Sequence, residues 1–297
     1  MDIKTKAAWL SVASNTLLMS GKFIVGFMIG SVSVISEAIH SANDLLASFI
    51  ALFAVQRSSK PPDKEHPYGH GKIENISGTI EALLIFVAAI MIVKEAVEKI
   101  LHGGELMDTT WGIVIMGISA GVNFLVSAYL LKVGKETDSV ALEADGMHLR
   151  TDVLTSAGVF VGLILIKLTG LKIIDPIAAI LVAILIFKAA YDLTKKAFLP
   201  LIDTALEEEK LVMVQNILCD YSHSFIEYHQ LRTRKAGRDS HIDLHLVISA
   251  DKSVKEAHEL CDVIEERIEA CITHSHVLIH VEPALPDCIK TSESGNY

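Results

Sequence analysis

Two copies of the motif His-x-x-x-Asp stand in separate apolar stretches of the chain, at His40/Asp44 and at His148/Asp152. On an α-helix, residues four apart differ by about 40° around the axis and about 6 Å along it, so the two side chains of a motif share one face. Two helices packed by these faces would bring two imidazole nitrogens and two carboxylate oxygens to one point. Such a tetrahedral donor set suits Zn²⁺ first and other divalent transition metals second.

The alternative for these four residues is that they only satisfy one another inside a helix bundle. Ionisable groups at membrane depth are costly, and they usually mark a substrate or proton pathway. Two matched pairs therefore favour metal transport over internal pairing. Because Zn²⁺ binds neutral imidazole and ionised carboxylate, metal entry displaces protons and proton entry expels metal. The motifs thus predict a proton-coupled antiporter.

A second candidate site lies in the loop between the second and third apolar stretches. Asp63, His66 and His70 fall within eight residues there, and Gly69 and Gly71 allow the backbone to bend around a metal. The alternative is a hydrated loop with incidental histidines. We expect metal binding, in a structural role or at the entrance to the transport path.

A third candidate site lies in the last third of the chain, on segments expected to be strands and one helix. Its members are four imidazoles and one carboxylate: His229, His245, His258, His280 and Glu282. Each histidine taken singly is more often a surface residue than a ligand. Gathered from separate elements at one sheet edge or at a subunit interface, they predict a shared metal site.

The composition predicts an α-helical membrane protein. The 297 residues are 51% hydrophobic with a mean hydropathy of +0.43, and the apolar stretches reach the roughly 20 residues that a bilayer core requires. We expect six transmembrane helices, at approximately Ala8–Gly30, Val32–Gln56, Ile76–Ile100, Thr110–Lys132, Val140–Leu168 and Ile173–Leu193.

The basic residues predict the orientation in the membrane. Most of those outside the spans fall on one side, namely Lys4, Lys6, Arg57, Lys60, Lys64, Lys72, Lys132, Lys135, Lys195 and Lys196. By the positive-inside rule this side is cytoplasmic, so both termini are expected in the cytoplasm and the protein in the cell (inner) membrane. The net charge of −10 and the absence of a basic stripe argue against nucleic-acid binding.

The sequence predicts two domains and a tail. Residues 1–203 form the transmembrane domain, residues 204–285 a cytoplasmic α+β domain, and residues 286–297 a disordered tail. The order within the second domain is expected to be helix, strand, strand, helix, strand, which suits a small sheet with helices on one face.

Two other function classes are weaker. A membrane metalloprotease would need His-Glu-x-x-His on a helix, and the chain contains no such pattern, so we expect no enzyme. A membrane metal sensor would need a cytoplasmic metal site, but it would not need four ligands among the spans.

With these motifs the chain resembles the cation diffusion facilitator family, and in particular its bacterial zinc and iron efflux pumps. The resemblance also includes the segments His66–Lys72 and Leu231–Arg234. It implies a homodimer in the lipid bilayer with a ferredoxin-like, metallochaperone-like cytoplasmic domain. It implies a transport site, a loop site and a binuclear cytoplasmic site at the three sets of residues above, and a salt bridge between Lys72 and Asp203.

The chain departs from the bacterial pumps at two ligands. Many of them carry Asp at the position of His40, and most carry Asp at the position of Glu282. Two histidines with two aspartates resemble the zinc transporters of eukaryotic vesicles, so we expect export of Zn²⁺. The loop also resembles the magnetosome branch, so Fe²⁺ stays an alternative, as do Mn²⁺ and Cd²⁺.

Overall fold

The computed structural model describes residues 2–29, 32–102, 110–169 and 173–284. The chain divides into two compact units, Met1–Leu201 and Ile202–Tyr297, which are described separately below. The predicted tail, residues 286–297, lies outside the described residues.

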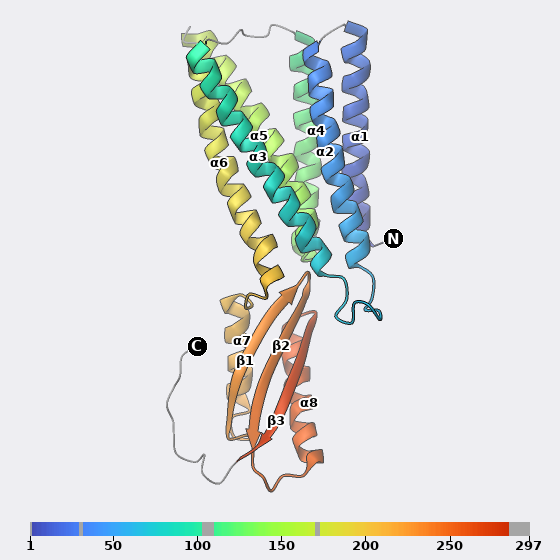
Figure 1. Cartoon of the computed structure of the whole chain (residues 1–297), viewed down its shortest axis with the longest axis vertical. Coiled ribbons are helices and arrows are strands. Elements are labelled where there is room, and N and C mark those ends of the chain that lie inside the picture. The colour runs from blue at the N-terminus through green and yellow to red at the C-terminus, as the bar shows by residue number, and fades with distance from the viewer. Residues whose placement is uncertain (1, 30–31, 103–109, 170–172, 285–297) are drawn as a thin grey trace. The chain divides into compact units, whose positions relative to one another are not determined.

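Six long helices build the first unit (Figure 1). They are α1 (Ile3–Ile29), α2 (Val32–Ser58), α3 (Lys72–His102), α4 (Thr110–Glu136), α5 (Val140–Thr169) and α6 (Ile174–Phe198). Five of them, α1 to α4 and α6, are long and apolar enough to cross a membrane. The prediction of a helical membrane domain is confirmed, and each predicted span coincides with one helix.

Small residues hold these helices close together. The most extensive packing joins α1 to α2, α3 to α6 and α4 to α5, and α5 also contacts α2, α3 and α6. Fully buried alanines such as Ala8, Ala82 and Ala190 lie in the two cores of the unit, where they allow close approach of the backbones. Large apolar side chains point outward instead, for example Leu17 and Phe27. Small residues inside and large apolar residues outside are typical of a helix bundle that faces lipid.

A buried ion pair ties the start of α1 to the start of α3. Lys4 Nζ lies 2.9 Å from Glu74 Oε1, and both side chains are at most 4% exposed. The hydroxyls of Ser58 and Ser139 also donate to the Glu74 carboxylate. Four segments of the bundle therefore meet at one carboxylate whose charge is paired and hydrogen-bonded.

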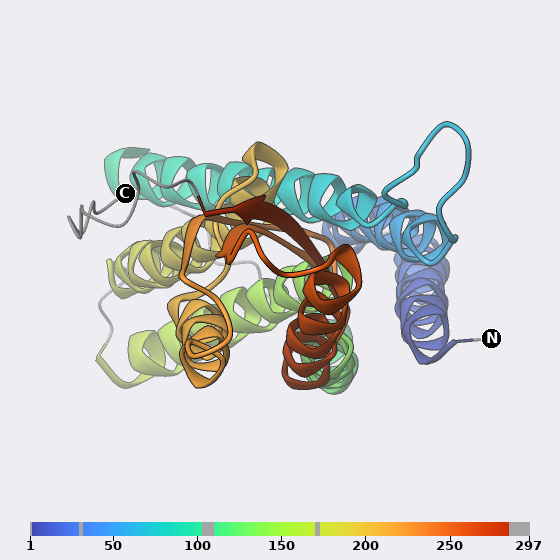
Figure 2. The ribbon, with the colours of Figure 1, turned by 90° about the horizontal axis from the view of Figure 1, so that it is seen from below.

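The second unit is an αββαβ domain, as predicted. A one-turn 3₁₀ helix (Leu199–Ile202) follows α6, and then come α7 (Glu208–Asp220), β1 (Glu227–Ala236), β2 (Asp239–Ile248), α8 (Val254–Cys271) and β3 (Ser275–Pro283). The sheet has the order β1-β2-β3, with β1 antiparallel and β3 parallel to β2. Figures 1 and 2 show α7 and α8 on the same face of the sheet.

One face of the sheet makes the core of this unit. Ile242, Leu244 and Leu246 alternate along β2 and are buried against Val214 of α7 and Ile264 of α8. The intervening residues of β2 consequently point to the opposite face. A capping box of Ser253 and Glu256 begins α8, and these hydrogen bonds lower the pKa of the Glu256 carboxyl.

A β-bulge in β1 sets which side chains reach which face. His229 is paired with His245, but Arg232 is paired with Asp243, so β1 holds one extra residue between these pairs. Gln230 takes up the irregularity with a φ of +51°. Because of this extra residue, Leu231 can pack on the core while His229 stays on the open face.

Candidate metal sites

The two His-x-x-x-Asp motifs meet between α2 and α5. One donor atom each from His40, Asp44 and Asp152 lie within 4.8 Å of one another. His148 Nε2 lies 3.4 Å from Asp44 Oδ1 and His40 Nε2 lies 4.0 Å from the same oxygen. The structure therefore places one nitrogen and two oxygen donors, from His40, Asp44 and Asp152, within reach of one cation, and it places the His148 ring against the same Asp44 carboxylate.

This cluster is unevenly exposed. The side chains of Asp44 and His148 are 7% and 12% exposed, whereas that of His40 is 57% exposed. His148 Nδ1 and Asp152 Oδ2 are buried and have no hydrogen-bond partner among the described residues. Unpartnered buried donors and acceptors cost free energy, so their lone pairs are suited to a bound cation that enters from the side of His40.

A lysine beside the cluster was missed by the sequence reasoning. Lys22 of α1 is 7% exposed, and its Nζ donates to Ser41 Oγ at 2.8 Å. Its charge is close enough to act on Asp152. The sequence signal was available, since Lys22 is a single cation inside an apolar stretch.

Buried polar groups continue from the cluster along α1, α2 and α5. Ser48, one turn after Asp44, lies 3.2 Å from Asp145, one turn before His148. Asn15 of α1 donates to the same Ser48 hydroxyl at 2.6 Å. Together they form a hydrogen-bonded network beside the four candidate ligands.

Glu81 of α3 is a second residue that the sequence reasoning missed. Its side chain is fully buried and accepts a hydrogen bond from Ser77, and its Oε2 has no partner within the part of the chain that the structure describes. Asp145 and His148 of α5 are its ionisable neighbours. A glutamate within the apolar stretch of the third span was the signal that could have indicated it.

The loop residues Asp63, His66 and His70 also come together. Asp63 Oδ1 lies 3.4 Å from His66 Nδ1, and Asp63 Oδ2 lies 3.3 Å from His70 Nε2. Their donor atoms all lie within 4.8 Å of one another. His70 Nδ1 is buried and has no partner among residues 2–29, 32–102, 110–169 and 173–284, while Asp63 and His66 are about half exposed. The three donors can therefore clamp one metal at the protein surface.

Local backbone geometry positions this loop. The amides of Glu65 and His66 donate to Asp63 Oδ1 at 3.0 and 2.7 Å, and the His66 amide is the main reason why the pKa of Asp63 is lowered. Gly69 adopts a φ of +84°, which an L-residue rarely does, and its N–H donates to His66 O. The turn thus returns His70 to Asp63 and keeps that carboxyl ionised.

The third cluster lies on the open face of the sheet. His245 Nδ1 lies 2.8 Å from Glu282 Oε1, and His229 Nε2 lies 3.5 Å from Glu282 Oε2. His280 Nε2 lies 3.8 Å from Glu282 Oε1. The hydrogen bond with His245 is the main reason why the pKa of the Glu282 carboxyl is lowered. One ionised carboxylate therefore joins three imidazoles.

Strand register brings these residues together. His229 is paired with His245 across β1 and β2, and His245 with His280 across β2 and β3. Glu282 follows His280 by two residues, so both share the face opposite α7 and α8. Three imidazoles in one row across the sheet are a direct result of this register.

His258 does not join this cluster within one chain. It lies on α8, is 76% exposed, and has its Nδ1 3.3 Å from Asp262 Oδ1. Because α8 covers the other face of the sheet, His258 does not gather with the strand histidines of its own chain, and its place in a site at a subunit interface stays a prediction.

The salt bridge between Lys72 and Asp203 would involve one residue of each unit and stays a prediction. Within the second unit, Asp203 Oδ1 lies 3.6 Å from Arg234 Nη1.

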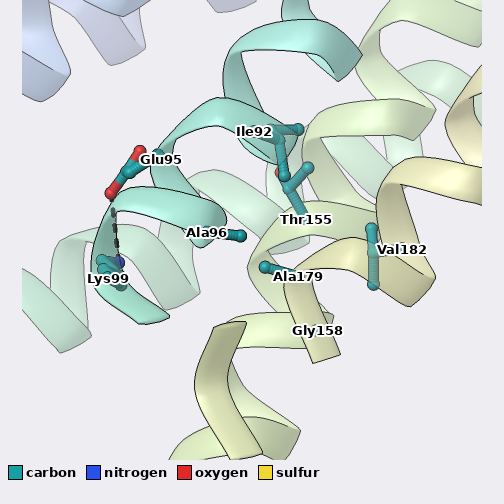
Figure 3. Close-up of a pocket in the computed structure, with 8 residues that line it drawn as sticks. All are labelled: Ile92, Glu95, Ala96, Lys99, Thr155, Gly158, Ala179 and Val182. Carbon is teal, nitrogen blue, oxygen red and sulfur yellow. Dashed lines mark ion pairs between the residues drawn. The ribbon is translucent and has the colours of Figure 1, made fainter. Parts of the chain in front are cut away.

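A cavity between α3, α5 and α6 coincides with none of the three clusters. Figure 3 shows its lining of small and apolar residues, among them Ala96, Gly158 and Ala179, around about 120 Å³. Its two charged residues, Glu95 and Lys99, pair with each other at 3.1 Å. Among the described residues, the lining of this cavity contains none of the candidate metal-donor groups.

Comparisons with known proteins agree along nearly the whole chain. A family profile described as "Cation efflux transmembrane domain" matches residues 8–202, and one described as "Cation efflux protein, cytoplasmic domain" matches residues 206–284. An uncharacterised transporter of Synechocystis is 34% identical over 276 residues, covering 93% of this chain and 89% of that protein.

Two further proteins illustrate the range of relatives. The manganese efflux system protein MneP of Bacillus subtilis is 30% identical over 294 residues, covering 95% of this chain and 97% of that protein. Among solved structures, the zinc form of CzrB is 35% identical and covers 27% of this chain and 92% of that chain, with a TM-score of 0.26.

Proposed function

Because the chain belongs to the cation efflux family, the cation diffusion facilitators, we propose that it exports Zn²⁺ from the cytoplasm in exchange for protons. Members of this family are transporters and not enzymes, and this chain is a multi-pass membrane transporter of divalent metal cations. The convergence of His40, Asp44, His148 and Asp152 is the single observation that carries the proposal.

The donor set supports zinc as the cargo. Two imidazole nitrogens and two carboxylate oxygens match the tetrahedral preference of Zn²⁺, whereas Mn²⁺ favours oxygen ligands in larger numbers. Mn²⁺ is the second candidate, because a relative with 30% identity is named as a manganese efflux protein. Fe²⁺ and Cd²⁺ are further candidates for the same site.

Proton coupling follows from the chemistry of the donors. Each imidazole must be neutral and each carboxylate ionised to bind the metal, so binding releases protons and protonation releases metal. Access to these residues from alternate sides of the membrane would convert an inward proton gradient into outward metal movement. The exposed His40 ring beside the buried Asp44 carboxylate supports such exchange on one side.

The other two clusters support metal binding outside the transport path. The loop residues Asp63, His66 and His70 would hold metal at the entrance or fasten the loop. The sheet cluster of His229, His245, His280 and Glu282 would sense the cytoplasmic metal. His258 could contribute only from a second copy of the chain, which agrees with a homodimer.

The membrane orientation is part of the proposal. The lysine distribution supports a position in the cell (inner) membrane with both termini in the cytoplasm. A membrane metal sensor would be a different class of function, but a sensor has no need of the four donors gathered between α2 and α5.

Metal flux into proteoliposomes tests the proposal. The purified chain is reconstituted around a zinc-sensitive dye with an imposed proton gradient, and Asp152→Asn is compared with Glu136→Gln. Both substitutions replace a carboxylate by its amide, but Glu136 is an exposed residue that pairs with Lys132 on α4, away from the cluster.

Zinc uptake that is driven by the proton gradient, is abolished by Asp152→Asn and is retained by Glu136→Gln would support zinc as the transported ion, the coupling to protons and the transport site. Flux of Mn²⁺ or Fe²⁺ without Zn²⁺ would overturn the choice of zinc. A zinc flux that does not change with the proton gradient would overturn the antiporter mechanism. Folded protein that transports none of the three metals would favour the sensor.

A further inference from the structure

A groove in the wall of the first unit gathers cationic side chains. It measures about 370 Å³, lies between α4, α5 and α6, and is lined by Lys135, Arg150, Lys188 and Lys196. Two carboxylates, of Glu143 and Asp192, also line it, which leaves an excess of two positive charges. The groove shares no residue with the three candidate metal clusters.

Most of this positive charge has no ion-pair partner among the residues that the structure describes. Lys196 Nζ lies 2.6 Å from Glu143 Oε2, so these two residues neutralise each other. Among the residues that the structure describes, no ion pair joins Lys135, Arg150 or Lys188 to a carboxylate, and all three are exposed. Three cations therefore face whatever fills the groove.

Helix geometry places these cations at different depths along the bundle. Glu143, Met147 and Arg150 follow one another at spacings of four and three on α5, so they share a face. Lys188 and Lys196 share a face of α6 and lie about 12 Å apart along its axis. Apolar residues stand between the charges, including Leu131, Met147 and Leu185.

An exposed cation within a membrane-spanning unit is costly unless its long side chain reaches a counter-charge at the bilayer surface. Water-soluble anions would satisfy the cations, but they would leave the apolar floor of the groove uncovered. A lipid has both parts, since its phosphate meets the cations and its acyl chain covers the apolar residues. Basic pockets between membrane helices bind anionic headgroups in this way.

We propose that the groove between α4, α5 and α6 binds an anionic phospholipid, whose phosphate contacts Arg150, Lys188 and Lys135 while an acyl chain lies against Leu131 and Leu185. The groove is at the lysine-rich end of the bundle, so the lipid belongs to the cytoplasmic leaflet. The excess of positive charge selects an anionic headgroup over a zwitterionic one. This binding does not depend on which metal the protein carries.

Native mass spectrometry of the full chain in detergent tests the inference with phosphatidylglycerol and phosphatidylcholine as probes. The test variant is Arg150→Gln with Lys188→Gln. The matched control is Lys132→Gln with Lys195→Gln, because these exposed lysines lie on α4 and α6 at the same end of the bundle but do not line the groove. Thermal unfolding of each variant without added lipid shows that it is folded.

We expect phosphatidylglycerol to bind the unmodified chain and the control variant alike. The test variant should lose roughly thirtyfold in affinity, as two cations near an anionic headgroup predict. Equal losses in both variants, or equal binding of phosphatidylcholine, would overturn the proposal. Displacement of the lipid by inorganic phosphate at the same concentration would also overturn it, because the site would then be one for a soluble anion.

Discussion

His148 Nε2 of α5 lies 3.4 Å from Asp44 Oδ1 of α2, so two residues 104 positions apart in the sequence are in contact within the first unit. The same Asp44 oxygen lies 4.0 Å from His40 on its own helix. One carboxylate thereby links both motifs. A cation bound here would touch both helices, so its binding would resist their separation.

Replacing His40 tests the role of nitrogen donors in metal choice. His40→Asp leaves one imidazole and three carboxylates, a set better suited to metals that favour oxygen. We expect the ratio of zinc to manganese flux to fall, and a loss of about 1.4 kcal/mol of preference would lower it about tenfold. Parallel dye assays in proteoliposomes measure this ratio, and an unchanged ratio would show that His40 is no ligand.

Removing the charge of two glutamates on α3 should change the stability of the protein in opposite directions. Glu74 is buried with Lys4 and two serine hydroxyls as partners, so Glu74→Gln should destabilise the bundle by about 3 kcal/mol. Glu81 is equally buried but has an unpartnered oxygen, so Glu81→Gln should be neutral or stabilising by up to about 1 kcal/mol.

Thermal unfolding of both variants in the same detergent measures this difference. Because the two residues lie on one helix and undergo the same substitution, each serves as the control for the other. Equal destabilisation would mean that Glu81 has a partner as important as that of Glu74.

The pKa of Glu282 predicts a pH dependence of the second unit. His245 lowers this pKa below its ordinary value of 4.5, so the carboxylate contributes stability that is present above about pH 4.5. That contribution is lost as the pH falls through the lowered pKa. Glu282→Gln should therefore be less stable than the unmodified chain at neutral pH, and the difference should shrink in acid.

Unfolding temperatures between pH 7 and pH 3.5, in the presence of a chelator, measure this effect. Glu259→Gln is the control, since Glu259 is an exposed residue of α8 that pairs only with Lys255 among the described residues. If the difference in unfolding temperature between Glu282→Gln and the unmodified chain did not change with pH, the predicted link between the Glu282 pKa and stability would be contradicted.

Two substitutions of Asp63 should distinguish its role in the folding of the loop from its role in metal binding. Asp63→Asn keeps an oxygen that can accept the amides of Glu65 and His66, but it removes the charge beside His70. Asp63→Ala removes both the accepting oxygen and the charge. We expect Asn to weaken zinc binding with the loop intact, and Ala to weaken binding and also raise amide hydrogen exchange over residues 63–70.

Isothermal titration with zinc and hydrogen exchange on the same samples measure the two effects. Equal zinc affinity in Asp63→Asn and the unmodified chain would show that this carboxylate is not a ligand.

Features that depend on local spacing could be predicted from the residues alone. The four-residue interval of His40/Asp44 and His148/Asp152 places each pair on one helix face wherever the helix lies. Apolar stretches of bilayer length predicted all six helices, and strand and helix patterns predicted the αββαβ order of the second unit. These are short-range properties, so no knowledge of packing was needed.

How distant elements meet depends instead on long-range packing. The approach of α2 to α5 and the burial of Glu81 result from packing among six helices, which no spacing specifies. On the sheet, the extra residue at Gln230 decides that His229 stands beside His245, because a shift of one residue reverses every side chain of a strand. The same packing places α8, and with it His258, on the opposite face from the other histidines.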